Sequence, residues 1–172
     1  MFRLADRIDQ FSTAVGRAVA WLVLFVVVMQ FAVVLLRYAF GVGSIWLQES
    51  IVYGHAFAFM LALAWVLKLD GHVRVDVFYR EAGERTRAWV DLLGGIFLLL
   101  PLSIVILWLS LPYAARAWAI LEKSQETSGL PSVFILKTAI PVAAAMLTLQ
   151  GMVEVLRAGS RLARPRTRNR KR

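Results

Sequence analysis

The chain has 172 residues, of which 59% are hydrophobic, above the roughly 45–50% of an average soluble domain. It contains no cysteine, which excludes disulfides, thiolate metal sites and thiol nucleophiles. The net charge is +9, and its interpretation depends on where the basic residues lie along the chain.

Four segments are long and almost free of charge. They cover residues 18–36, 51–67, 92–115 and 138–156. A helix rises about 1.5 Å per residue, so the first segment reaches about 28 Å, close to the hydrocarbon thickness of a bilayer. Lipid offers the backbone no hydrogen-bond partner, so each segment must be helical. We therefore predict an all-α membrane protein with four transmembrane helices in a single membrane domain, residues 1–172.

The basic residues divide unequally between the two sides that four crossings define. Sixteen precede the first segment, separate the second from the third, or follow the fourth, whereas only four lie in the other two connections. Cytoplasmic loops carry the excess of Lys and Arg. Both termini and the central loop are therefore predicted to be cytoplasmic.

The two termini are read as membrane-surface segments. In residues 1–17, Leu4, Ile8 and Phe11 recur at helical spacing among polar residues, which predicts an amphipathic helix in the interface; a short frayed leader is the alternative. Residues 157–172 form a tail in which half the residues are basic and none is aromatic. Such a tail favours anionic lipid headgroups over nucleic acid, which would call for rings that stack on bases.

The first outer turn follows the first span. Glycines at 41 and 43 mark the turn, Ser44 is a predicted helix cap, and Trp46 fits the aromatic belt of a membrane surface. Arg37 and Glu49 end two adjacent helices on the same side, so we expect an ion pair between them.

Prolines and polar residues mark the rest of the chain. The alternating segment from His72 to Asp76 is expected to form a turn or irregular connection, because a lone strand lacks a partner. Pro101 is expected to kink the third span, and Pro141 is placed in the first turns of the fourth. The outer connection of about twenty residues, 116–136, is long enough to be functional or docked.

Few side chains within the spans offer chemistry. Gln30 and His55 lie at membrane depth, where each is expected to hydrogen-bond a neighbouring helix; the alternative is an oligomeric channel or proton-conducting protein that uses both. His72 with Asp70 and Asp76 is better read as a solvated loop than as a metal site. No catalytic set is found, so we expect neither an enzyme nor a cofactor.

Several of these segments together resemble one family, the small permease subunit of tripartite ATP-independent periplasmic (TRAP) transporters, known as DctQ-like. The resembling residues are Arg37-Tyr38, Phe40-Gly41, Trp46, Glu49, Gly71 to Asp76, Arg87 to Leu92, Ser128 to Pro131, Lys137 and Ile140-Pro141. The run His72-Val73-Arg74-Val75-Asp76 is the most specific part of the resemblance.

The resemblance implies a function. In that family a periplasmic binding protein delivers a solute, usually a carboxylate, to a small and a large membrane subunit, and a sodium gradient drives import. The large subunit is thought to hold the solute and sodium sites, so the small one is expected to be a scaffold in the bacterial inner membrane. The residues expected at the subunit or docking interfaces are Arg37, Trp46, Glu49, His72, Arg74, Asp76, Glu126, Gly129 and Pro131. The spans are expected to pack against the large subunit, with Gly94, Gly95 and Gly151 allowing close helix approach.

Overall fold

The computed structural model describes residues 2–70 and 82–163, so the predictions for His72, Arg74 and Asp76 lie outside the described residues. The elements in chain order are α1 (Phe2–Phe40), α2 (Ile45–Lys68), α4 (Glu84–Gly94), the π-helical turn η1 (Gly95–Leu99), α5 (Leu100–Ala119) and α6 (Val133–Ala163). Helices α4, η1 and α5 run on without interruption, which gives four helices long and apolar enough to cross a membrane. The prediction of an all-α protein with four membrane spans is confirmed.

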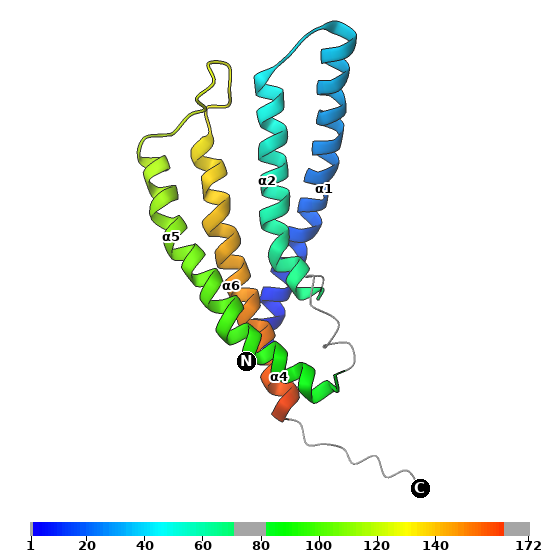
Figure 1. Cartoon of the computed structure of the whole chain (residues 1–172), viewed down its shortest axis with the longest axis vertical. Coiled ribbons are helices and arrows are strands. Elements are labelled where there is room, and N and C mark those ends of the chain that lie inside the picture. The colour runs from blue at the N-terminus through cyan, green and yellow to red at the C-terminus, as the bar shows by residue number, and fades with distance from the viewer. Residues whose placement is uncertain (1, 71–81, 164–172) are drawn as a thin grey trace.

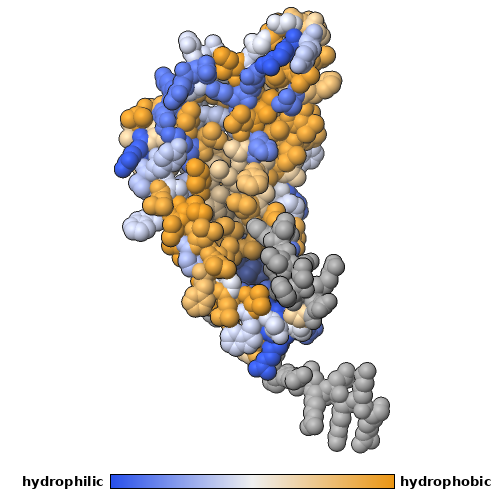
Figure 2. Space-filling view, in the orientation of Figure 1, coloured by the Kyte–Doolittle hydropathy of each residue, from blue (hydrophilic) through white to orange (hydrophobic). Residues whose placement is uncertain are grey.

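The helices form two hairpins, α1–α2 and α5–α6, that meet through α2 and α6 and diverge toward one end (Figure 1). We call that the outer end; it holds the α1–α2 turn and the α5–α6 connection. The start of α1 and the end of α6 lie at the opposite, inner end (Figure 1). On the face seen in Figure 2, apolar residues cover the middle of the molecule and hydrophilic residues gather toward its ends.

Helix α6 is the centre of the bundle. In its most apolar stretch 39% of the residues are buried, against 6–17% in the other three helices. Its buried face carries small side chains, among them Ala139, Ala143 and Ala144, which let neighbouring backbones approach closely. The other helices consequently turn most of their apolar surface outward.

Two of the three glycines expected at the interface with the large subunit allow close packing within the chain. A Cβ at Gly95 would lie 2.5 Å from Val155 Cγ2, and one at Gly151 would lie 3.1 Å from Leu99 Cδ2. Gly94 has no atom within 4 Å of the corresponding position, so it stays a candidate for contact with the large subunit. The helix turns 100° per residue, and only the second glycine of the pair faces α6.

The distortion expected at Pro101 takes the form of a π-helical turn just before it. Proline has no N–H, so the carbonyl four residues earlier loses its usual donor. In η1 the spacing between hydrogen-bond donor and acceptor widens from four residues to five, so the N–H of Leu100 donates to the carbonyl of Gly95.

All four helices extend beyond the sequence-based limits, and the differences in α1 and α6 change how polar residues are assigned. Helix α1 has 39 residues, so the amphipathic segment 1–17 and the first span are one helix. Helix α6 begins at Val133, which puts Pro141 inside it rather than in its first turns. It continues to Ala163, so Arg157 and Arg161 belong to the helix and not to a basic tail.

Candidate functional site

At the outer end, Glu49 of α2 holds the connection between α5 and α6. Its Oε1 accepts a hydrogen bond from the Ser124 hydroxyl, and its Oε2 accepts one from the backbone N–H of Leu130. The N–H of Ser124 in turn donates to the carbonyl of Leu130 at 3.2 Å. These residues with Gly129 form the outer cluster, which links the two hairpins where their helices diverge.

Gly129 is required by this geometry. A Cβ at this position would lie 2.7 Å from Glu49 Oε1 and still closer to the Ser124 side chain. Any side chain here would push apart the groups that hold the connection. Of the residues predicted for the docking interface, the structure thus brings together Glu49 and Gly129.

The expected ion pair between Arg37 and Glu49 does not form. Arg37 is exposed near the end of α1 and makes no ion pair within the described ranges 2–70 and 82–163. Both oxygens of Glu49 already accept hydrogen bonds from the outer connection. Sequence proximity suggested the wrong partner, because the true one lies 75–81 residues further along the chain.

A second set of contacts fixes the ends of α5 and α6. Lys137 Nζ donates to Glu122 Oε1 at 2.7 Å and lies 4.4 Å above the centre of the Tyr113 ring. Trp118 Nε1 donates to Thr138 Oγ1 at 2.8 Å. The connection, residues 120–132, is therefore docked at both its beginning and its end.

The remaining predicted docking residues lie on the surface of this end. Trp46 is 51% exposed, and Glu126 and Pro131 are also exposed. The Glu126 backbone belongs to the connection, since its carbonyl accepts from the N–H of Gly129 at 3.0 Å. The ordered connection thus presents these side chains outward.

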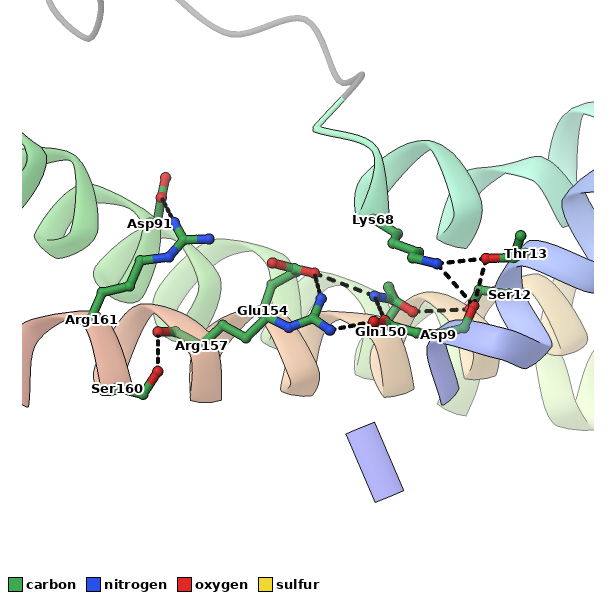
Figure 3. A network of polar contacts seen from close by, with 10 residues as sticks. All are labelled: Asp9, Ser12, Thr13, Lys68, Asp91, Gln150, Glu154, Arg157, Ser160 and Arg161. Carbon is green, nitrogen blue, oxygen red and sulfur yellow. Dashed lines mark hydrogen bonds and ion pairs between the residues drawn. The ribbon is translucent and has the colours of Figure 1, made fainter. Parts of the chain in front are cut away.

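At the inner end, α1 and α6 share a polar network (Figure 3). Asp9 pairs with Arg157, which also donates to Glu154 Oε1 at 2.9 Å. Gln150 is fully buried between these groups: its Oε1 accepts from the Ser12 hydroxyl at 2.9 Å, and its Nε2 donates to Asp9 Oδ1 at 3.0 Å. We call this set the inner network.

Helices α2 and α4 are tied to the same end. Lys68 Nζ of α2 donates to Thr13 Oγ1 at 2.6 Å and to the Asp9 carbonyl at 3.3 Å, and Arg161 lies 3.6 Å from Asp91 of α4 (Figure 3). Charged side chains from all four membrane helices therefore lie at the inner end. Four such charges balance one another, because Asp9, Glu154, Lys68 and Arg157 contribute two of each sign.

The sequence of this chain matches one known protein family. Residues 24–160 match the sequence model of the DctQ component of tripartite ATP-independent periplasmic transporters. The chain belongs to the DctQ family. No curated protein and no solved structure matches it. The recognition as a TRAP small permease subunit is confirmed, and the match spans the outer cluster and the α6 part of the inner network.

The two polar residues expected to bridge helices do not do so in this DctQ-family chain. Gln30 and His55 are exposed on α1 and α2, and neither makes a hydrogen bond with any other described residue. Nor do the described residues include a group of three His, Cys, Asp or Glu side chains able to hold a metal. The charged side chains of the described helices lie instead toward the two ends, and a buried hydrogen bond from Thr148 to Ser103 joins α6 and α5 between them.

The inner network was missed by the sequence analysis, although part of it left a signal. Gln150, Glu154 and Arg157 recur at intervals of four and three, which puts them on one face of a helix. The sequence analysis ended the fourth span at residue 156 and therefore assigned Arg157 to the tail. Asp9 gave no such signal, because it is one of several polar residues on α1.

Proposed function

We propose that this small TRAP permease subunit acts as a scaffold for a large transport subunit in sodium-coupled import of a carboxylate-type solute. Its outer connection helps dock the periplasmic binding protein. The family match supports a small membrane subunit of a TRAP transporter, and the finer role is inferred from how polar and apolar groups are distributed.

The observation that carries the scaffold role is the absence of a polar route through the described part of the chain. Its hydrogen-bonded charges sit at the ends, and the middle of the bundle is packed by small apolar residues of α6. Transport pathways are lined by polar or charged groups in register. A subunit built in this way is suited to support another protein rather than to move a solute itself.

Its outward surface is suited to an apolar partner. Trp21 and Phe31 of α1 and Phe97 and Trp108 of η1 and α5 are 68–73% exposed. In a membrane such faces meet lipid or the helices of another subunit. We infer that part of this surface packs against the large permease subunit.

The orientation follows from charge. Sixteen of the twenty Lys and Arg residues belong to the side of the membrane that includes the inner end. This end therefore faces the cytoplasm of a bacterial cell, and the outer cluster faces the periplasm. The ordered connection, with Trp46, Glu126 and Pro131 on its surface, then lies where a periplasmic binding protein arrives. No cofactor is needed for such a role, and sodium coupling belongs to the large subunit.

Co-purification and uptake test the proposal. The tagged chain is expressed with the large subunit and binding protein encoded nearest to it, and the large subunit is expected to co-purify. The solute is found by thermal shift of the binding protein against a panel of carboxylates, including 2-oxo acids. Proteoliposomes holding both membrane subunits should then accumulate that solute with an inward sodium gradient, and omission of the small subunit should abolish uptake.

The alternative, an oligomeric channel that uses Gln30 and His55, makes the opposite prediction. The chain reconstituted alone would conduct ions or protons across liposomes. Conductance that disappears in Gln30→Leu or His55→Leu would replace the scaffold proposal with the channel.

A further inference from the structure

An open groove of about 250 Å³ lies between the first turns of α1 and the middle of α6. It is lined by Arg7, Ile8, Phe11, Ser12, Met146 and Leu149. The groove lies beside the inner network, because Ser12 also belongs to that network. Its place in the bundle is therefore the inner end, where the membrane helices meet the interface.

The floor and walls of the groove are apolar in character. Phe11 and Leu149 are 56% and 44% exposed, and with Ile8 and Met146 they offer an apolar surface. Ser12 is the one neutral polar residue in the lining. It is 2% exposed, and its hydroxyl already donates to Gln150. The walls thus favour a hydrocarbon chain over a polar ligand.

The rim carries a cation that the rest of the described chain leaves uncompensated. Arg7 is exposed and makes no hydrogen bond or ion pair with a described residue. Arg3, also exposed, lies one helical turn earlier on the same side of α1. A guanidinium binds a phosphate through two parallel hydrogen bonds, so a phosphate at this rim would meet two matching donors in sequence.

We propose that this groove is a binding site for one anionic phospholipid. An acyl chain lies between Phe11 and Leu149, and the headgroup phosphate binds Arg7 with Arg3 nearby. A negative headgroup is favoured over a zwitterionic one, because the basic rim has no competing ion pair in the described structure.

Native mass spectrometry of the full chain in detergent tests the site. The protein is titrated with dioleoyl phosphatidylglycerol or with dioleoyl phosphatidylcholine, which has the same chains and no net charge. Phosphatidylglycerol is expected to bind about fivefold more tightly, which corresponds to one basic residue at an anionic surface. Arg7→Gln should remove most of this preference. It should weaken binding of phosphatidylcholine much less, because the choline ammonium already compensates the phosphate of that lipid.

Two further variants separate the groove from general surface charge. Arg17→Gln removes the same charge from an exposed position of α1 outside the groove, and the lipid preference should remain. Leu149→Trp fills the groove and should weaken binding of both lipids. Equal binding of the two lipids by the wild type, equal losses in the two arginine variants, or displacement of phosphatidylglycerol by millimolar inorganic phosphate would each overturn the proposal.

Discussion

Asp9 in α1 and Arg157 in α6 form an ion pair, although 148 residues separate them in the chain. Their side chains are 13% and 32% exposed, so water screens the pair far less than a surface salt bridge. Gln150 Nε2 donates to the Asp9 carboxylate, and Gln150 Oε1 accepts from the Ser12 hydroxyl. The pair therefore fixes the first turns of α1 against the last turns of α6.

Replacement of Asp9 by Asn should destabilise the bundle. The change removes the charge that partners Arg157 and leaves a hydrogen bond to a charged group unmade, which costs about 1.5–3 kcal/mol. Thermal unfolding of the detergent-purified chain should shift downward by several degrees. Asp6→Asn is the matched control, because Asp6 is exposed one turn earlier. Equal shifts in the two variants would contradict a specific role for the ion pair.

Removal of Glu49 should release the outer connection. Glu49→Ala deletes two hydrogen bonds to a charged acceptor, so local opening of residues 120–132 should rise about tenfold or more. Limited trypsin digestion reports this opening as faster cleavage after Lys123. Arg37→Ala should leave the cleavage rate unchanged, since Arg37 does not contact Glu49. Faster trypsin cleavage of the Arg37→Ala variant would contradict the structure and support an ion pair between Arg37 and Glu49.

Substitution of Gly129 by Ala should disturb the same cluster from the other side. The new Cβ would overlap Ser124 and crowd Glu49 Oε1, and overpacking of this kind costs about 1–3 kcal/mol. The cleavage rate after Lys123 should rise as it does for Glu49→Ala. Gly43→Ala provides the comparison, because no atom lies within 4 Å of the Cβ it would add. A Gly129 variant as resistant to trypsin as the wild type would argue against tight packing here.

The adjacent glycines of the third span should respond in opposite ways to alanine. Gly95→Ala places a Cβ 2.5 Å from Val155 Cγ2, and valine is too stiff to move aside freely, so a loss of about 1–3 kcal/mol is expected. Gly94→Ala meets nothing within 4 Å and gains up to about 1 kcal/mol of helix propensity. The unfolding temperature of the two variants measures the difference. A stable Gly95 variant would mean that η1 and α6 pack less closely than described.

The architecture was predictable from sequence because lipid imposes it. Each apolar segment had to form a helix, and Ser44 was correctly placed as the cap of α2, where the Leu47 N–H donates to its hydroxyl. The helix ends were harder to place, since α1 and α6 extend past the apolar segments into polar sequence. Hydropathy shows where an apolar segment ends, whereas a helix that packs against neighbouring helices continues beyond that residue.

The candidate site was predictable only in part. Glu49 and Gly129 were singled out through the family resemblance, and the structure brings them together. Their contact depends on how two hairpins diverge and rejoin, which local periodicity does not encode. Asp9 and Gln150 were missed for the same reason: an acidic residue on a polar helix face and an amide in a span give no hint of each other.

Helix α6, on which α1, α2, α4 and α5 all pack, is synthesised after all of them. At about 5–20 residues per second, Arg157 follows Asp9 after roughly 7–30 s. During that interval the earlier helices occupy the membrane without the element that organises them. The bundle can therefore close only once α6 has been made, and a nascent chain that stops short of α6 has nothing around which to close.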